Sequence, residues 1–268
     1  MKKTKIIGIL NLTDNSFYDG GKHVNINDAV NHVKRMIKEG ADIIDIGAES
    51  TKPGFKDVGA DNQLKKILPV IQKIKQDYNS MLISVDTRSS LVAKETLAAG
   101  ASIINDVSSG TYDSKMMKIV SDKKAKIILT HMPQSHQTKE VSELNIKHTP
   151  KNIEHYFNER IEQALSEGIK KDNIIVDPGI CYGKAGKDNI EVIKNIQYFV
   201  KTFKNVCLGV SNKKFSSDLF SHFHDEELNI VSLAVTTHCV LNNVAYVRVH
   251  DVAANRDALE VAWKTCVV

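Results

Sequence analysis

Several common signals are absent from this sequence. It has no long hydrophobic run near its start: residues 5–10 (KIIGIL) are apolar apart from Lys5, but polar residues follow at once, so the run is too short for a signal peptide or a membrane span. The four cysteines, Cys181, Cys207, Cys239 and Cys266, lack the paired spacing of a zinc or redox site, and reduced thiols are expected. GxSxG, HExxH, P-loop and GxGxxG motifs are also missing.

Neither sign of charge dominates the chain. The net charge is +4, and the lysines are scattered instead of being gathered in one stripe, which argues against nucleic acid or a membrane surface as the main partner. Hydrophobic residues make up 42% and charged residues 25% of the sequence, as is usual for a globular protein with a large buried core. We therefore expect any role of the cationic side chains to be local, and the reduced thiols point to a cytoplasmic protein.

Eight short apolar runs are each followed by a polar or glycine-rich segment. The runs cover residues 5–10, 42–47, 82–85, 102–105, 125–130, 173–176, 206–210 and 245–249. Runs rich in Ile, Val and Leu without strict alternation are typical of parallel strands that are covered on both faces. Eight such units in 268 residues favour an α/β fold of the (β/α)₈ TIM-barrel type over a doubly wound sheet, since roughly 250 residues is usual for one barrel. The sequence predicts a single domain over residues 1–268, with its active site where the strands end.

Segments with helical periodicity separate the apolar runs. They span residues 27–39, 61–77, 88–99, 113–122, 151–167, 188–203, 227–243 and 253–265. Several end at a glycine, as helices commonly do: Gly40, Gly100 and Gly168. The predicted order is strand then helix, repeated eight times.

Three polar residues stand at the ends of predicted strands in the middle of the chain: Asp86, Asn105 and Asp177. In a barrel their side chains converge over the mouth. Two carboxylates and an amide can recognise the amino group and ring N–H donors of a flat heterocycle. The alternative, for Asp86 or Asp177 taken alone, is an aspartate that only caps the following helix.

Candidate cations follow the last two predicted strands. Lys213, Arg248 and His250 lie there, in the quadrant where barrels often bind phosphate. The valines on both sides of Arg248 should direct its side chain inward. Asn11 ends the first predicted strand and could give an oxygen to a Mg²⁺ ion that phosphates already bridge, although an asparagine in this position is commonly a turn residue.

Two connections carry further candidates. The one after the first predicted strand includes Phe17 and Asp19, and the one after the second includes Thr51, Lys52 and Pro53. Loops of this kind can cover a bound substrate and exclude water. The alternative is a pair of exposed connections without a catalytic role.

Seven segments, read in order, resemble the signature of the dihydropteroate synthase family. The members of this family are pterin-binding enzymes with a TIM barrel. The segments are NLTDNSFYDGG (residues 11–21), GADIIDIGAESTKPG (40–54), SVDT (84–87), INDV (104–107), DPGICYGK (177–184), SNKKF (211–215) and RVHDV (248–252). The resemblance spans nearly the whole chain. It implies a homodimeric transferase of folate biosynthesis that uses Mg²⁺, joins 6-hydroxymethyl-7,8-dihydropterin pyrophosphate to p-aminobenzoate and releases pyrophosphate.

The resemblance also implies a role for each candidate residue. The pterin would be held by Asp86, Asn105, Asp177, Lys213 and Arg248. Pyrophosphate would be held by Asn11, Thr51, Arg248 and His250, with Asn11 acting through Mg²⁺. p-Aminobenzoate would lie against Lys52, Pro53, Tyr182, Lys213 and Lys214, while Phe17 and Asp19 would cover the reacting centre. In the family mechanism pyrophosphate leaves first, and the aromatic amine then attacks the pterin cation, so Asp86, Asp177, Lys213 and Arg248 would stabilise the separated charges.

The chain departs from the family pattern mainly around the second substrate. Lys52 and Asn212 stand where the family has arginines, and Cys181 and Tyr182 replace a glycine and a phenylalanine. These changes predict an altered response to sulfonamides, which occupy the slot of p-aminobenzoate. Two alternatives follow: a catalytically altered or inactive pterin-binding homologue, and a methyltetrahydrofolate-dependent methyltransferase on a related barrel, which would not need the predicted anion site.

Overall fold

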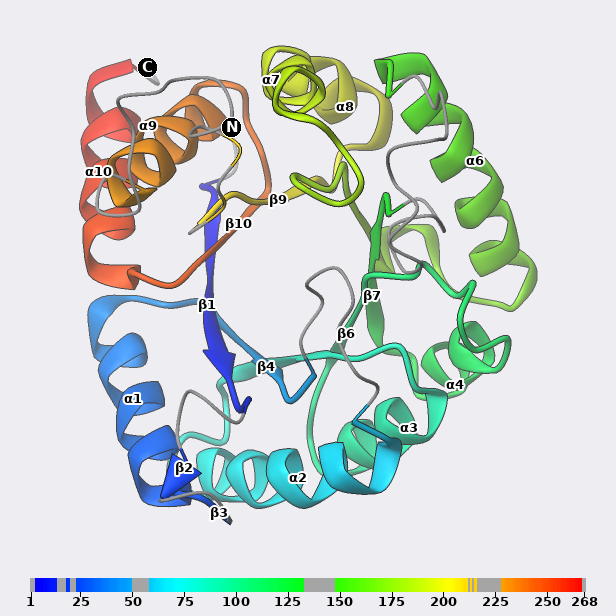
Figure 1. Cartoon of the computed structure of the whole chain (residues 1–268), viewed down its shortest axis with the longest axis vertical. Helices are drawn as coiled ribbons and strands as arrows, with labels where there is room; N and C mark the ends of the chain where they lie inside the picture. The colour runs from blue at the N-terminus through cyan, green and yellow to red at the C-terminus, as the bar shows by residue number, and fades with distance from the viewer. Residues whose placement is uncertain are drawn as a thin grey trace.

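The computed structural model describes residues 3–13, 18–19, 23–49, 58–132, 148–211, 213, 215 and 228–266, with the backbone alone at residues 18, 19, 23, 24 and 266. In this part of the chain, eight parallel strands form a nearly closed barrel that is surrounded by helices, as Figure 1 shows. This is the (β/α)₈ TIM barrel expected from the sequence. The strands are β1 (Lys5–Asn11), β4 (Ile43–Gly47), β5 (Leu82–Asp86), β6 (Ile103–Asp106), β7 (Lys126–Thr130), β8 (Ile174–Asp177), β9 (Cys207–Gly209) and β10 (Tyr246–Val249).

The strands pair in the order β8, β7, β6, β5, β4, β1, β10 and β9. Each strand therefore pairs with the barrel strand that precedes or follows it in the sequence, except that β1, the first, also pairs with β10, the last. β8 approaches β9 through a parallel bridge between Val176 and Val206. The amide of Val176 also donates a hydrogen bond of 3.0 Å to the carbonyl of Asn205. These contacts bring the first and last strands of the sheet together and close the ring.

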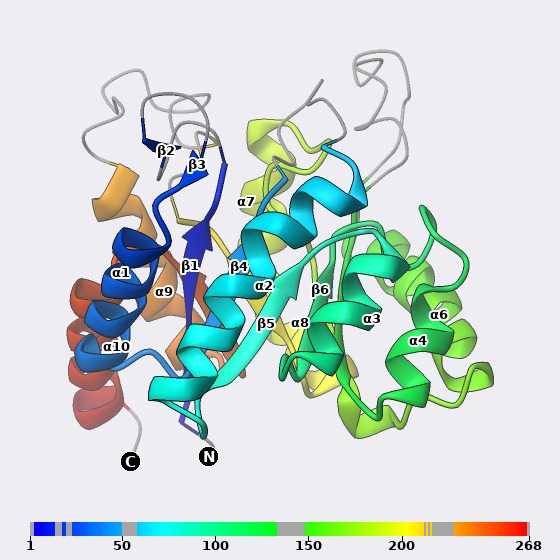
Figure 2. The same ribbon diagram turned by 90° about the horizontal axis from the view of Figure 1, so that it is seen from below.

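Helices form the outer layer of the barrel. They are α1 (Ile26–Glu39), α2 (Ala60–Asp77), α3 (Ser90–Ala98), α4 (Met116–Asp122), α6 (Pro150–Ser166), α7 (Gly186–Lys194), α8 (Ile196–Phe203), α9 (Leu228–Leu241) and α10 (Val252–Cys266). A short antiparallel pair, β2 (Tyr18–Asp19) and β3 (His23–Val24), lies at the end of the barrel opposite the two ends of the chain, as the side view in Figure 2 shows, and the 3₁₀ helix η1 (Lys171–Asn173) precedes β8. No helix in the described ranges is long and apolar enough to cross a membrane.

Local sequence explains where several helices begin and end. The side chain of Ser89 caps α3 and that of Thr149 caps α6, whose first residue is Pro150. The expected helix over 188–203 is divided into α7 and α8 at Asn195. The side-chain amide of Asn195 donates to both the backbone carbonyl (2.9 Å) and the carboxylate (2.8 Å) of Glu191. An amide that bonds to the backbone in this way competes with the helix and bends it.

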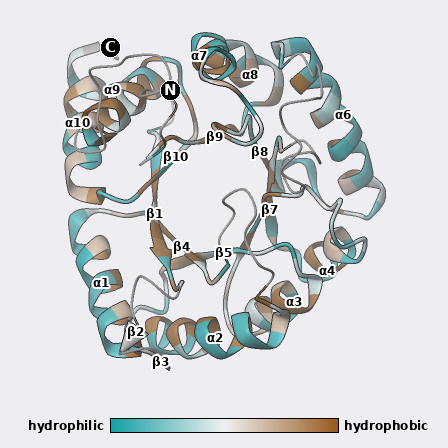
Figure 3. Cartoon of the chain, in the orientation of Figure 1, coloured by the Kyte–Doolittle hydropathy of each residue, from teal (hydrophilic) through white to brown (hydrophobic). Residues whose placement is uncertain are grey.

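The hydrophobic core has two layers. The larger one fills the space between the strands and the helices, and Figure 3 shows brown, hydrophobic strands within a ring of helices whose surfaces carry much hydrophilic teal. The smaller one lies inside the barrel, and we call it the barrel floor: Ile7, Ile43, Ile103, Ile128, Ile175 and Cys207, with Tyr246 packed against them. Burial on both faces explains why the strand sequences lack strict alternation.

Candidate active site

Polar side chains replace apolar ones directly above the barrel floor. Two residues after a floor residue, the inward positions hold Asp45, Asn105, Thr130, Asp177 and, after Tyr246, Arg248. Side chains two apart on a strand point to the same face, so these residues enter the barrel interior at the end where the strands finish. In TIM-barrel enzymes this is the end that carries the active site.

The side chain of Arg248 joins two aspartates across the barrel mouth. Its Nε donates to Oδ2 of Asp45 at 2.5 Å, and its Nη2 donates to Oδ2 of Asp86 at 2.8 Å. The expected inward direction of Arg248 is therefore observed, and Asp86 and Arg248 meet although 162 positions separate them in the sequence. The helix-capping alternative does not apply to Asp86, because Ser89 caps the helix that follows it.

Burial sets the protonation of this cluster. Removal from water raises the pKa of Asp86 to about 7; the positive charge of Arg248 opposes this rise, and the negative charges of Asp45, Asp106 and Glu49 add to it. Burial alone would lower the pKa of Arg248, but Asp45 and Asp86 outweigh this effect and raise it. The guanidinium thus stays charged, while Asp86 binds a proton more readily than an ordinary carboxyl group does.

Asp177 lies on the β8 side of the same mouth. Its Oδ1 accepts a hydrogen bond of 2.8 Å from the amide of Gly179, and burial raises its pKa, against the opposing effect of Lys213. Gly209 lies between Arg248 and Asp177: a Cβ at this position would make ordinary contacts, 3.6 Å from Cβ of Arg248 and 3.9 Å from Oδ2 of Asp177. The helix-capping alternative does not apply to Asp177 either, since α7 begins after Ala185.

Lys213 and Tyr182 lie together, as expected for two residues beside one substrate. The Lys213 ammonium donates to the carbonyl of Ile180 at 2.7 Å and lies 4.4 Å from the centre of the Tyr182 ring. A cation over an aromatic face is attractive. Burial lowers the pKa of Lys213, while Asp177 raises it.

His250 and Asn11 meet on the β1 and β10 side of the mouth. Nδ1 of His250 is 2.9 Å from the hydroxyl of Ser211, and its Nε2 is 3.4 Å from Nδ2 of Asn11. Burial, together with the nearby charges of Arg248, His32 and Lys213, lowers the pKa of His250 to about 4. Burial therefore favours the neutral, hydrogen-bonding form of His250, whereas the sequence placed this residue among the candidate cations.

The other predicted site residues lie outside the described side chains. Residues Phe17, Thr51, Lys52, Pro53 and Lys214 are outside the described ranges, and only the backbone of Asp19 is described, in β2. The predicted site residues whose side chains the structure describes are Asn11, Asp86, Asn105, Asp177, Tyr182, Lys213, Arg248 and His250.

The fit to Mg²⁺ depends on the donors available around Asn11. This side chain is exposed at the end of β1 and offers one amide oxygen. Within the described ranges there is no group of three or more His, Cys, Asp or Glu residues that could hold a metal. A single protein oxygen suits Mg²⁺ only when substrate phosphates and waters complete its octahedral shell, so the residues fit an ion that arrives with a phosphorylated substrate.

The structure adds polar residues that the sequence analysis did not select. Asp45 is fully buried, and its position two residues after Ile43 is a signal that the period of the strand could have revealed. Lys184 is also buried: its ammonium donates to the carbonyl of His131 at 3.1 Å, and burial lowers its pKa to about 7, against the opposing charge of Asp177. Both residues lie within segments that carry the family resemblance, residues 40–54 and 177–184, but their burial and their contacts become visible only in the folded chain.

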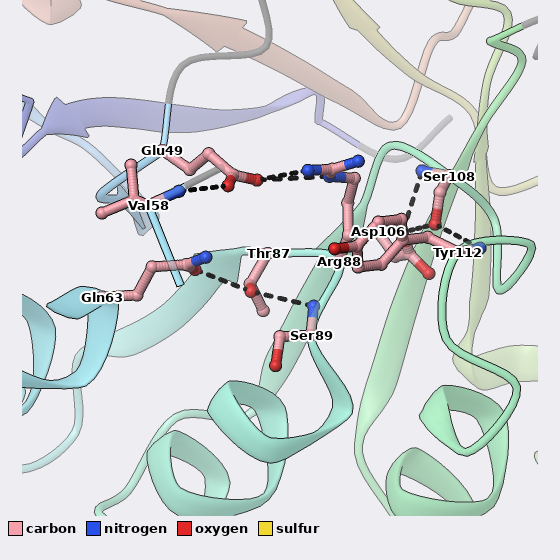
Figure 4. Close-up of polar contacts among 9 residues, drawn as sticks. All are labelled: Glu49, Val58, Gln63, Thr87, Arg88, Ser89, Asp106, Ser108 and Tyr112. Carbon is pink, nitrogen blue, oxygen red and sulfur yellow. Dashed lines mark hydrogen bonds and ion pairs between the residues drawn. The ribbon is translucent and has the colours of Figure 1, made fainter. Parts of the chain in front are cut away.

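A buried ion pair lies beside the mouth, where Figure 4 shows it. Nε and Nη2 of Arg88 donate to Oε2 of Glu49 at 3.2 and 2.9 Å, and both side chains are 6% exposed. Oε1 of Glu49 accepts from the amide of Val58 at 3.2 Å, and the guanidinium lies 4.1 Å from the centre of the Tyr112 ring. Arg88 therefore connects the segments that follow three consecutive barrel strands, β4, β5 and β6.

Known proteins of the same fold are similar to this chain in both sequence and structure. The pterin-binding enzyme family matches residues 7–250. A dihydropteroate synthase from Streptococcus pyogenes serotype M1 is 36% identical over 257 residues, which are 96% of this chain and 93% of that protein. The crystal structure of the dihydropteroate synthase of Clostridium difficile, determined in the presence of pteroic acid, has a TM-score of 0.89 and 34% identity and covers 98% of this chain and 97% of its own.

A third comparison concerns the second substrate. The dihydropteroate synthase of Xanthomonas albilineans, solved with 4-aminobenzoic acid, has a TM-score of 0.90 and 32% identity, and covers 99% of this chain and 94% of its own. The family match covers most of the chain, and the relatives align over almost their full length. This chain therefore belongs to the pterin-binding enzyme family and, within it, to the dihydropteroate synthases, transferases of folate biosynthesis.

Proposed function

We propose that this chain condenses 6-hydroxymethyl-7,8-dihydropterin pyrophosphate with p-aminobenzoate, giving 7,8-dihydropteroate and pyrophosphate. The observation that carries the proposal is the ion-paired cluster of Arg248 with Asp86 and Asp45, with Asn105 and Asp177 on neighbouring inward positions. Carboxylate and amide acceptors suit the amino group and ring N–H donors of a pterin. The guanidinium, which keeps N–H groups beyond those given to the two aspartates, suits a phosphate group.

In the proposed mechanism, the bond between the pterin methylene carbon and the pyrophosphate oxygen breaks first, and its electron pair leaves with pyrophosphate. Asp86 and Asp177 stabilise the electron-poor ring, and Arg248 holds the departing anion. The nitrogen lone pair of p-aminobenzoate then forms the new bond to the methylene carbon. The amine loses one proton to solvent, so the reaction needs no strong general base.

The pyrophosphate side of the site is assigned to Asn11, Thr51, Arg248 and His250. The neutral imidazole of His250, held by the Ser211 hydroxyl at 2.9 Å, can donate or accept one hydrogen bond without adding charge. Mg²⁺, held through the Asn11 oxygen, would neutralise charge that develops on the leaving group.

p-Aminobenzoate is assigned to a slot bounded by Lys52, Pro53, Tyr182, Lys213 and Lys214. Support comes from the stacking of the Lys213 ammonium on the Tyr182 ring, which offers a cation for a carboxylate and an aromatic face for a ring. In the same proposal, Phe17 and Asp19 shield the pterin cation from water. Sulfonamides would share this slot, and Tyr182, which adds a hydroxyl to the family's phenylalanine, would change their affinity relative to that of p-aminobenzoate.

We assign the chain to the cytoplasm as a homodimer that associates through its last two described helices. Three apolar side chains there are notably exposed: Ile230 (61%) and Leu241 (43%) of α9 and Val261 (62%) of α10. Burial of such a surface against a second copy would remove apolar area from water.

The function is tested by mixing the purified chain with the pterin pyrophosphate, Mg²⁺ and p-aminobenzoate. We expect pyrophosphate release that depends on the amine and equals dihydropteroate formation. Pterin binding without product would instead identify the catalytically altered homologue, and methyl transfer from methyltetrahydrofolate would identify the methyltransferase alternative. Growth of a synthase-deficient bacterium without folate end products, when it expresses this chain, provides the matching test in cells.

A further inference from the structure

Asp45 is more completely buried than any residue assigned to a substrate above whose side chain the structure describes. It follows the floor residue Ile43 by two positions on β4, and its exposed fraction is 0%. In the sheet register it pairs with Ser84 of β5, whose small side chain also points inward. Asp45 can therefore reach past β5 to a residue of β6 and, on the other side, past β1 to a residue of β10.

One oxygen of Asp45 holds two residues of the site. Its Oδ2 accepts from Nε of Arg248 at 2.5 Å and from Nδ2 of Asn105 at 3.2 Å. We propose that Asp45 is a positioning residue, which fixes the amide of Asn105 as a hydrogen-bond acceptor for the pterin and the guanidinium of Arg248 as a donor for the pyrophosphate. This inference rests on the proposed function.

The contact determines which way Asn105 presents its amide. Only the NH₂ group can face a carboxylate, because the opposite orientation would bring two acceptor oxygens together. With Nδ2 committed to Asp45, the oxygen of Asn105 is the group that meets a donor on the ligand. The amide then matches the 2-amino group of a pterin and rejects a carbonyl in the same place.

The same contact determines how Arg248 is used. A guanidinium has five N–H bonds, of which one at Nε and one at Nη2 are given to Asp45 and Asp86. The other three N–H groups remain for a ligand, and the two carboxylates already fix the plane of the guanidinium. Such an arrangement is prepared for the bidentate recognition of a phosphate group.

An architectural role alone does not explain Asp45. Its Oδ1 is buried and has no hydrogen-bond partner among the residues that the structure describes. Burial of a carboxylate with one unpaired oxygen is unfavourable, and such groups are uncommon in protein interiors. If Asp45 served only to pack the barrel, an apolar residue could replace it without loss of stability. A buried carboxylate is useful here because it orders two ligand-binding groups.

The test compares Asp45→Asn with Ser84→Ala, a neighbouring inward substitution that leaves Arg248 and Asn105 untouched. Calorimetry gives the affinities for 6-hydroxymethylpterin and for its analogue with a carbonyl in place of the 2-amino group. We expect Asp45→Asn to bind the pterin about tenfold more weakly, as the loss of one charge-assisted hydrogen bond implies. We also expect it to discriminate less against the analogue, because the new amide lets Asn105 adopt either orientation. Ser84→Ala should keep the discrimination of the parent chain.

The pH profile supplies a readout that a packing defect would not change. The groups that face Asp86 are Arg248 from β10, Asp45 from β4, Asp106 from β6 and Glu49 beyond β4. Removal of the negative charge of Asp45 leaves Arg248 opposite Asp86 and lowers the pKa of that carboxyl. The acidic limb of kcat/KM should therefore move to lower pH in Asp45→Asn and stay in place in Ser84→Ala.

A folded Asp45→Asn variant with unchanged discrimination and an unchanged acidic limb would overturn the inference. Asp45→Ser, which removes the same charge and leaves space for water, repeats the test if the asparagine variant does not fold. An inactive parent chain would refute the proposed function alone, because the binding measurements still report whether Asp45 orients Asn105.

Discussion

Substitution of Arg88 by methionine removes one half of the buried ion pair shown in Figure 4. Both partners are 6% exposed, so solvent screens their interaction little. The Glu49 carboxylate would lose two N–H donors, at 2.9 and 3.2 Å, and among the described residues would keep the Val58 amide at 3.2 Å. Removing one partner of a buried pair destabilises a protein by about 3–5 kcal/mol, and loss of the stacking on Tyr112 adds about 0.5–1 kcal/mol.

The double substitution separates the ion pair from the volume of the side chains. Glu49→Gln keeps the shape of the glutamate and leaves the Arg88 charge unpaired, whereas the double variant of Glu49→Gln and Arg88→Met removes both charges. We therefore expect the double variant to be more stable than the sum of the single changes by about 2–3 kcal/mol. Replacing a buried pair by neutral groups of similar volume is often close to neutral.

The assay is urea unfolding followed by the fluorescence of Trp263 and by far-UV circular dichroism, whose midpoints must coincide for a two-state analysis. Lys118→Met is the matched control, since Lys118 and its partner Asp122 are 59% and 53% exposed, and it should leave the midpoint unchanged. Additive effects of the two substitutions, or a loss below about 1 kcal/mol for Arg88→Met, would refute the reasoning.

Three further predictions concern the site and the loops around it. Asp177→Asn should weaken the binding of 6-hydroxymethylpterin by about 2 kcal/mol, roughly thirtyfold, because an ionised hydrogen bond is lost; unchanged affinity in calorimetry would exclude Asp177 from the pocket. Gly179→Ala should lower the melting temperature more than Gly59→Ala: the two glycines have φ values of +73° and +74°, but only at Gly179 would a Cβ lie 2.3 Å from a backbone oxygen, that of His131. Equal losses would show that backbone conformation alone matters. Lys184→Met tests the pKa of Lys184, which burial lowers from 10.5 to about 7. Between pH 7 and 10.5 the unfolded parent chain binds more protons than the folded one. The free energy of unfolding of the parent chain should therefore rise with pH relative to that of the variant, by up to about 1.4 kcal/mol per pH unit. A constant difference over this window would mean that Lys184 titrates normally.

The sequence by itself was enough to predict the barrel and to select most of the polar residues that the structure describes at its mouth. Short apolar runs alternating with helical segments predict βα units, and eight of them predict closure. Because the carboxyl ends of parallel strands lie at one edge, Asp86 and Arg248 could be placed together from their positions in the chain alone. The ion pair between them, at 2.8 Å, is the result.

Only the tertiary structure decided the state of these residues and the identity of their neighbours. Asp45 gains its place from contacts with Asn105 and Arg248, which come from β6 and β10. The pKa of His250 falls and that of Asp86 rises because burial removes water from each group, and no local pattern encodes the degree of burial. Sequence spacing specifies which strand a side chain belongs to and which face of the strand it takes. Its charge and its hydrogen bonds depend on residues from other strands, which come near only when the barrel closes.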